Sequence, residues 1–128
     1  MEAELVRTAA ETPTILVGSH LTALEETALA ERGVRLVRAG SLEGGLRDLW
    51  EDGVASILIE GGGRLAGALL SGGLVDRFYW VVSPVWLGDH GIPATRGLDV
   101  ASLVQAERWT LVERRPLGQD TVLVFDRR

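Results

Sequence analysis

Apolar and polar positions change period several times along the first half of the chain, and each change marks a predicted element. The apolar run Thr14–Val17 predicts a first strand. Over residues 22–32 the apolar positions recur at helical spacing, and Gly33 ends that predicted helix. Residues 34–38 then alternate with period two, which is typical of a strand near a sheet edge. Strands and helices therefore follow one another in regular order.

The same order continues in the middle of the chain. Ser41 is the predicted cap of a helix that runs to Trp50. The unbroken apolar run Ile57–Ile59 predicts a strand buried on both faces of a sheet. A glycine turn follows, and then a helix in which Leu65, Ala68 and Leu69 recur at helical spacing until Gly72-Gly73 end it. A further strand starts near Arg77 and reaches Pro84.

The C-terminal part has a different pattern. Residues 88–106 are rich in glycine and predict a loop with one helical turn at Val100–Val104. Residues 108–115 and 121–126 predict an antiparallel pair around Gly118-Gln119-Asp120. Strands separated by helices imply right-handed crossovers. We therefore expect a single three-layer α/β domain over residues 1–128, with a mostly parallel sheet and an antiparallel C-terminal hairpin.

Composition narrows the class of protein. The net charge of −5 argues against a nucleic-acid backbone as the main partner. The absence of cysteine excludes a disulfide scaffold and thiolate metal sites. No apolar run approaches the length of a membrane span, and the polar first residues do not resemble a signal peptide. The absence of cysteine leaves the redox compartment undetermined.

Gly61-Gly62-Gly63 is the strongest candidate site. It lies where a predicted buried strand meets a helix, so free N–H groups and the positive end of the helix dipole favour an anion such as a phosphate. A tight turn that binds nothing is the alternative. Gly67, one turn later, leaves room for a neighbouring strand or a flat ligand.

The spacing of these glycines also fits a loose dinucleotide fingerprint, Gly61-x-Gly63-x-x-Ala66. A Rossmann unit needs an acidic residue at the end of the next strand, to hold the ribose hydroxyls. Here that strand ends in Ser83-Pro84, and Asp76 stands at its beginning. The Rossmann interpretation therefore fails.

Few other residues are candidates for chemistry. Ser19 and His20 follow the first strand at the sheet edge where ligands bind in open α/β sheets, although Ser19 is equally well read as a helix cap. His90 beside Asp89 has no second histidine at ligand spacing, so a solvated loop is the better interpretation. We expect no metal site.

A longer pattern resembles a known family. Residues 57–63, the segment 65–70, Gly73-Leu74-Val75-Asp76 and Ser83–Gly88 match, in order and spacing, the reductase domain of bacterial riboflavin biosynthesis. That domain is the C-terminal half of a bifunctional pyrimidine deaminase/reductase. Leu117-Gly118-Gln119-Asp120 is similar to the last hairpin of the family.

The resemblance implies a dihydrofolate-reductase-like fold and NADPH-dependent reduction of 5-amino-6-(5-phosphoribosylamino)uracil to its ribitylamino product. It also implies that Glu60 contacts the substrate, where it would hold sugar hydroxyls or stabilise a cationic iminium. A carboxylate that accepts N–H bonds from the next turn is the alternative for Glu60. Ser19 would lie beside the cofactor. The residues matching the family's cofactor turn and helix are Gly61, Gly62, Gly63, Arg64, Leu65, Ala66, Gly67 and Ala68.

One departure from the family concerns the N-terminal side. The family's domain begins with a strand, a Ser-x-Asp-Gly turn and an arginine-bearing helix that are not found in this sequence. We therefore expect a fragment, a domain completed by a partner chain, or a lineage without catalysis, and weak nucleotide binding without turnover. The alternative functions are a non-catalytic nucleotide-binding or assembly domain and a flavodoxin-like module for another phosphorylated ligand.

Large aromatic side chains predict self-association. Phe78-Tyr79-Trp80 and Trp86 lie on or beside one predicted strand, which is more than one sheet face of a small domain easily covers. The resemblance implies a cytoplasmic homodimer, as in the family.

Overall fold

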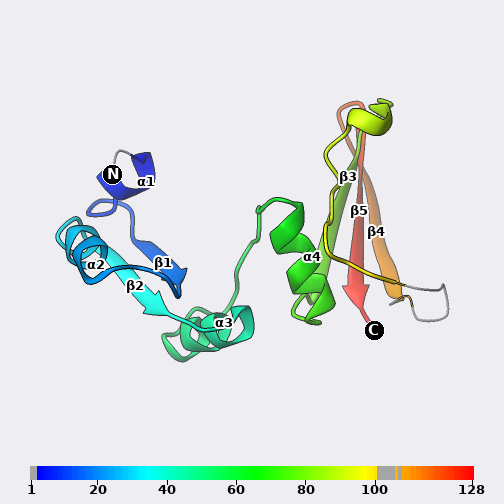
Figure 1. Ribbon diagram of the computed structural model, residues 1–128. Coiled ribbons are helices and arrows are strands. Elements are labelled where there is room, and N and C mark those ends of the chain that lie inside the picture. The colour runs from blue at the N-terminus through cyan, green and yellow to red at the C-terminus, as the bar shows by residue number, and fades with distance from the viewer. Residues whose placement is uncertain (1–2, 101–105, 107) are drawn as a thin grey trace. The chain divides into compact units, whose positions relative to one another are not determined.

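The computed structural model describes residues 3–100, 106 and 108–128, and the chain divides into two compact units, Met1–Leu58 and Ile59–Arg128. The elements are shown in Figure 1. The first unit contains α1 (Glu4–Arg7), β1 (Thr14–Gly18), α2 (Ala23–Ala30), β2 (Val34–Arg38) and α3 (Leu42–Glu51). The second contains α4 (Gly63–Ser71), β3 (Arg77–Val82), a 3₁₀ turn η1 (Gly88–His90), β4 (Trp109–Leu117) and β5 (Asp120–Arg127).

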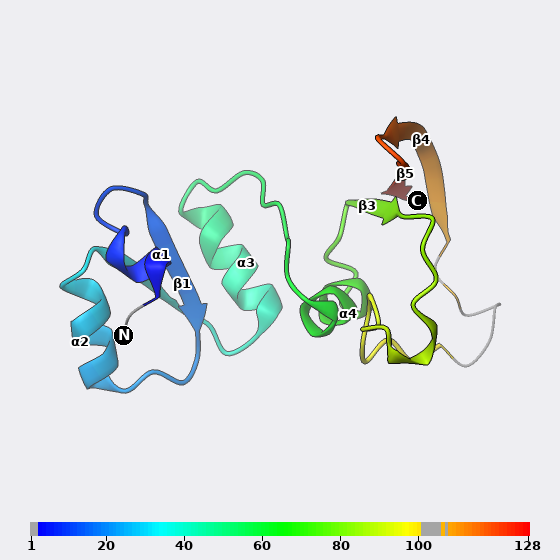
Figure 2. The same ribbon diagram turned by 90° about the horizontal axis from the view of Figure 1, so that it is seen from above.

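In the first unit, β1 and β2 form a parallel pair with Thr14 opposite Val34. Helices α1 and α2 lie on one side of this pair and α3 on the other (Figure 2). The core on the α1 and α2 side contains the buried residues Val6, Ala9, Leu29 and Val34. On the α3 side, a Cβ built on Gly45 would be 2.6 Å from the Cγ1 of Val17, so this glycine allows the helix to approach β1 closely. The parallel pair and its helices confirm the predicted α/β pattern here.

Local capping explains where these helices begin. Ser41 Oγ accepts the N–H of Gly44 at 3.0 Å, as predicted. The cap of α2 is Thr22, and its side chain and that of Glu25 form a reciprocal capping box. The interpretation of Ser19 as the helix cap was therefore wrong, because Thr22 fills that position.

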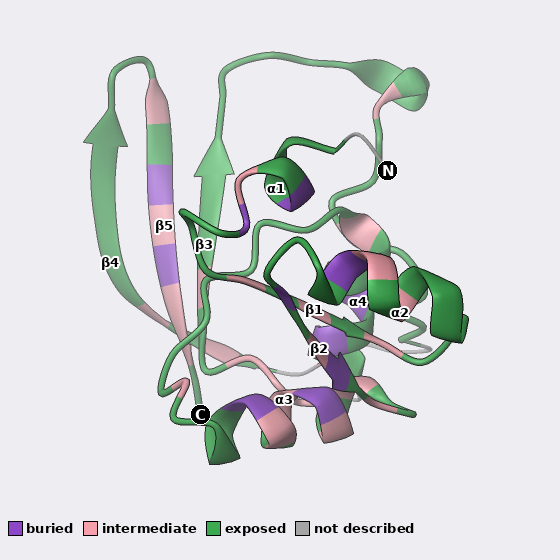
Figure 3. Ribbon diagram, turned by 90° about the vertical axis from the view of Figure 1, so that its left-hand side faces the viewer, coloured by how far each residue is buried: buried purple, intermediate pink, exposed green. Residues whose placement is uncertain are grey.

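In the second unit, β3, β5 and β4 form an antiparallel sheet in that order. The predicted C-terminal hairpin is confirmed, and Gly118 in its turn has a φ of +62°. One extra residue, Val112, interrupts the ladder between the pairs Leu111–Phe125 and Glu113–Val124. Helix α4 and the segment after β3 lie on one side of this sheet (Figure 2). In β5, Val122 and Val124 are buried (Figure 3).

Two expectations about the sheet require correction. The described residues form one parallel pair and one antiparallel sheet, so the sheet is not mostly parallel. Ile57–Ile59 belongs to no sheet in the described part of the chain, and Leu58 is 74% exposed. The physical reason is that a buried strand needs a ladder partner, and this run lies at the boundary between the two units. The helical turn expected at Val100–Val104 falls mainly outside the described residues.

Candidate functional site

The start of α4 is an uncapped helix N-terminus formed by glycine. Gly62 is the N-cap residue, with φ −73° and ψ 174°, and no side chain caps the helix. Its carbonyl oxygen accepts the N–H groups of Leu65 at 3.0 Å and Ala66 at 3.2 Å. Among the described residues, the N–H groups of Gly63 and Arg64 have no acceptor. Two donors at the positive end of a helix can therefore bind an anion.

Space around this turn is uneven. A Cβ built on Gly62 has no heavy atom within 4 Å, so this position is open. A Cβ on Gly61 would be 2.6 Å from the Cδ2 of Leu65, because that side chain folds back over the turn. A ligand that approaches the free N–H groups therefore has access past Gly62.

The other two glycines face the chain's own backbone. A Cβ on Gly63 would be 2.6 Å from the carbonyl oxygen of Pro93, and a Cβ on Gly67 would overlap the carbonyl oxygen of Arg96. The N–H of Arg96 donates to the carbonyl oxygen of Gly63 at 2.8 Å. Gly67 thus packs against a loop of the chain, whereas its lack of a side chain had suggested a neighbouring strand or a flat ligand.

Charged side chains near the turn are exposed and unpaired. Glu60 immediately precedes the turn, and its carboxylate accepts no hydrogen bond from the described residues. The alternative interpretation, an acid satisfied by the N–H groups of the next turn, does not describe this geometry. Arg64 and Arg96 are also exposed, and within the described ranges neither guanidinium forms an ion pair. One anionic and two cationic groups are thus available to a ligand.

The remaining residues of the predicted cofactor helix differ in exposure. Ala68 is exposed, Leu65 is just exposed and Ala66 is half-buried. Gly67 is buried beneath the loop at Arg96. The part of the helix that is open to a ligand is therefore its first turn.

Ser19 and His20 lie in the first unit and are exposed directly after β1. Their hydroxyl and imidazole groups form no hydrogen bond with the described residues. The turn residues Gly61 to Gly63 lie in the second unit, Ile59–Arg128, and Ser19 belongs to the first unit, Met1–Leu58.

Two features, one in each unit, were not predicted from the sequence. The capping box at Thr22 has a visible signal, since threonine stands three residues before glutamate. The hydrogen bonds from the Thr22 backbone N–H and hydroxyl lower the pKa of Glu25. The loop seated on Gly63 and Gly67 has no comparable signal, because nothing local in the sequence pairs it with the helix.

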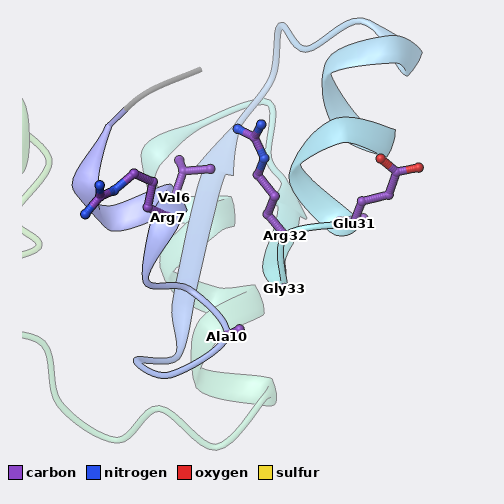
Figure 4. A pocket seen from close by; sticks show the side chains of 7 residues that line it. Val6, Arg7, Ala10, Glu31, Arg32 and Gly33 are labelled. Carbon is purple, nitrogen blue, oxygen red and sulfur yellow. The ribbon is translucent and has the colours of Figure 1, made fainter.

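A surface hollow of about 710 Å³ lies elsewhere, in the first unit (Figure 4). The side chains of Arg7, Glu31 and Arg32 point in different directions around it, and Arg7 pairs with Glu4 at 2.7 Å. The hollow therefore lacks a convergent set of polar groups. Its lining residues are Val6, Arg7, Ala10, Ala30, Glu31, Arg32 and Gly33.

Neither a metal-ligand cluster nor a membrane-spanning helix occurs in the described residues. The described residues contain no group of three or more His, Cys, Asp or Glu side chains that could hold a metal ion. Asp89 and His90 are exposed in η1. Across the described ranges, the helices are too short and too polar to cross a bilayer.

Comparison with known proteins gives a consistent result. The family model described as RibD C-terminal domain matches residues 1–123. A RibD protein of Chlamydia trachomatis is 38% identical over 91 residues, which are 66% of this chain and 24% of that protein. A RibD protein of Mycobacterium tuberculosis is 34% identical over 67 residues, or 52% of this chain and 20% of that protein. The chain thus spans about a quarter or less of the length of these curated relatives.

Solved structures show the same similarity. RibD of Acinetobacter baumannii superposes with a TM-score of 0.75 and 26% identity, covering 98% of this chain and 34% of that one. A pyrimidine reductase-like protein of Corynebacterium diphtheriae has a TM-score of 0.75 at 17% identity, covering 97% of this chain and 54% of that one. The latter similarity concerns the fold alone.

Proposed function

The chain belongs to the RibD C-terminal domain family, and from this membership we propose that it is a reductase module of riboflavin biosynthesis. The reaction is the NADPH-dependent reduction of 5-amino-6-(5-phosphoribosylamino)uracil to its ribitylamino product. One observation carries the proposal: the open, uncapped start of α4 at Gly62, with the exposed carboxylate of Glu60 beside it in sequence. The site would operate within a dihydrofolate-reductase-like domain in the cytoplasm.

The turn has the chemistry needed for the phosphate end of the cofactor. The N–H groups of Gly63 and Arg64 are free donors, and the Arg64 guanidinium is exposed in the first turn. A Cβ on Gly62 would meet nothing, so a phosphate oxygen has room to approach the backbone. The turn and the first helical residues, Gly61 to Leu65, would hold the nucleotide there.

When bound, the nicotinamide would supply a hydride to the anomeric carbon of the substrate. The bond from that carbon to the ring oxygen breaks, the ring oxygen takes up a proton, and an open-chain ribitylamine results. Positive charge develops on the iminium carbon and nitrogen before hydride arrives. The Glu60 carboxylate would stabilise this charge or hold the sugar hydroxyls, because its oxygens have no other partner among the described residues.

Replacement of Gly62 by valine tests the site. The branched side chain would fill the space over the two free N–H groups, so we expect NADPH binding to be lost while the far-ultraviolet circular dichroism is unchanged. Gly40→Val is the matched control, since a Cβ at Gly40 also has no atom within 4 Å. Titration of tryptophan fluorescence with NADPH measures the affinity. An unchanged affinity in Gly62→Val would place the cofactor elsewhere.

Catalysis is tested separately from binding. We would mix the chain, NADPH and the phosphoribosylamino-pyrimidine in a single-turnover experiment and follow NADPH absorbance. Oxidation that disappears in Glu60→Gln supports the reductase function and the role of the carboxylate, and it contradicts the expectation of weak nucleotide binding without turnover. Tight NADPH binding without oxidation would indicate the non-catalytic nucleotide-binding alternative.

A second copy of the chain is proposed as a partner. Phe78 lies 5.3 Å from Trp80 and 6.4 Å from both Trp109 and Phe125, measured between ring centroids. This aromatic cluster leaves Trp80 39% exposed, and the side chain of Trp86 is fully exposed. Burial of these rings against a second copy would remove a large apolar area from water.

A further inference from the structure

The close packing of one loop on α4 leads to an inference beyond the proposed function. Below, this packing is called the seating of the loop. The segment Pro93–Arg96 approaches the helix so closely that only glycine fits at two positions. A Cβ on Gly63 would be 2.6 Å from the Pro93 oxygen and 3.2 Å from the Ala94 oxygen. A Cβ on Gly67 would be 2.9 Å from the Arg96 carbonyl carbon and would overlap its oxygen.

These two glycines are four residues apart, so they lie on one face of the helix. Glycine disfavours a helix because it loses the most backbone freedom on folding. A nine-residue helix that begins with glycine and contains Gly67 therefore has little intrinsic stability. The loop compensates through backbone contact along this face and through the hydrogen bond from the Arg96 N–H to the Gly63 oxygen, at 2.8 Å.

Gly63 connects the loop to the anion-binding turn. Its N–H is one of the two free donors at the start of α4, while its carbonyl oxygen accepts the N–H of Arg96. An anion on the N–H side and the loop on the carbonyl side both require the first turn to be helical. Two events that favour the same local conformation stabilise one another, and this coupling acts equally in both directions.

We propose that Gly63 and Gly67 are positioning residues: they seat the segment Pro93–Arg96 on α4, and this seating is coupled to anion binding at the first turn. Gly67 then acts without touching the nucleotide. The inference rests on the proposed function only for the identity of the anion. The loop itself is a structural observation.

Arg96 provides a local probe of the seating of the loop. It is exposed, it precedes Gly97, whose φ of +75° keeps the chain in a turn, and trypsin cleaves after arginine. A seated backbone resists cleavage, because a protease needs an extended, detached segment. Limited trypsin digestion of the full chain, with the Arg96–Gly97 cleavage followed by mass spectrometry, therefore reports on the loop.

Gly67→Ala is the main variant, and Gly40→Ala is the control, because its Cβ would meet no atom within 4 Å and Gly40 lies outside the nucleotide-binding turn. Without ligand, we expect cleavage after Arg96 to be about tenfold faster in Gly67→Ala, because the added methyl group overpacks the contact and favours the detached loop. Gly40→Ala should match the wild type. Equal cleavage rates in Gly67→Ala and wild type would contradict the proposal that Gly67 positions the loop on α4. If circular dichroism shows that Gly67→Ala is unfolded, Gly63→Ala, with its milder contact at 2.6 Å, replaces it.

Ligand protection tests the coupling. Inorganic diphosphate and NADPH are added separately, and we expect each to slow cleavage after Arg96 in the wild type, with the effect reduced about tenfold in Gly67→Ala. A purely structural glycine would not change this protection. Protection by diphosphate but not by NADPH supports the coupling and rejects the proposed cofactor. If neither probe slows cleavage, the coupling is contradicted. It is also contradicted if Gly67→Ala has a lower affinity for NADPH while its cleavage rate is unchanged.

Discussion

Arg77 and Asp126 face each other across the β3–β5 ladder in a two-point ion pair. The Nε of Arg77 is 2.7 Å from Oδ1 of Asp126, and its Nη2 is 2.9 Å from Oδ2. These hydrogen bonds lower the pKa of Asp126. The same bonds raise the pKa of Arg77, and an interaction with Tyr79 adds to this increase. The pair thus joins the first residue of β3 to the end of the C-terminal strand.

This pair predicts a loss of stability in acid. Because the pKa of Asp126 is lower in the folded state, its contribution is complete above the unfolded value, about 3.9. It is lost as the pH falls through the folded value. We expect the difference in free energy of unfolding between wild type and Asp126→Asn to be constant from about pH 7 to 5 and to shrink below about pH 4.

Urea denaturation at several pH values measures this difference. Asp89→Asn is the matched control, because Asp89 is exposed and forms no ion pair with the described residues. A difference for Asp126→Asn that stays constant down to about pH 2.5, roughly 1.4 units below the unfolded aspartate pKa, would contradict the prediction.

The capping box of α2 predicts a second stability effect. Thr22→Ala removes the hydroxyl that accepts the Glu25 N–H at 3.3 Å, so we expect a loss of about 1 kcal/mol. Thr27→Ala is the control within the same helix. The Thr27 hydroxyl donates to the Ala23 oxygen at 2.9 Å, and alanine there should be neutral or stabilising. Equal losses in both variants would argue against a specific role for the cap.

Close packing of α3 on β1 predicts a third effect. A Cβ on buried Gly45 would be 2.6 Å from Val17 Cγ1 and 3.2 Å from the Cβ of Ala39. The strain of overpacking, about 1–3 kcal/mol, should exceed the gain in helix propensity of about 1 kcal/mol. Gly44→Ala has the same propensity gain and meets only the Ser41 Oγ at 3.2 Å. Thermal unfolding should therefore rank Gly45→Ala below Gly44→Ala.

Self-association is the fourth prediction. Light scattering at micromolar concentration should give a dimer mass for the wild type. Trp86→Gln should weaken the dimer about 30-fold, since an interface tryptophan typically contributes about 2 kcal/mol. Trp50→Gln, an exposed tryptophan of α3, serves as the control. A monomer mass for the wild type would exclude the proposed dimer.

Local signals in the sequence predicted most elements of the fold. Ser41 predicted the start of α3, and the alternation in residues 34–38 predicted β2, because both patterns depend on neighbours in the chain. The strand predicted at Ile57–Ile59 was wrong. The apolar run indicates that these residues favour burial. A strand also needs a partner strand from another segment, and the periodicity of the run does not identify that partner.

The candidate site was predictable in part for the same reason. A glycine triplet before a helical pattern located the uncapped start of α4 at Gly62. The neighbour of Gly67 was not predictable, because Arg96 lies 29 residues later in a segment without regular structure. The roles of Ser19 and Glu60 toward a ligand stay predictions that the proposed experiments test.

The extra residue at Val112 bears on how this hairpin tolerates changes in length. Leu111 pairs with Phe125 and Glu113 with Val124, so the chain could lose Val112 while both pairs are kept. A deletion elsewhere in β4 would instead move every later residue of the strand by one position against β5. We therefore expect insertions and deletions among relatives to concentrate at this position, with the rest of the strand constant in length.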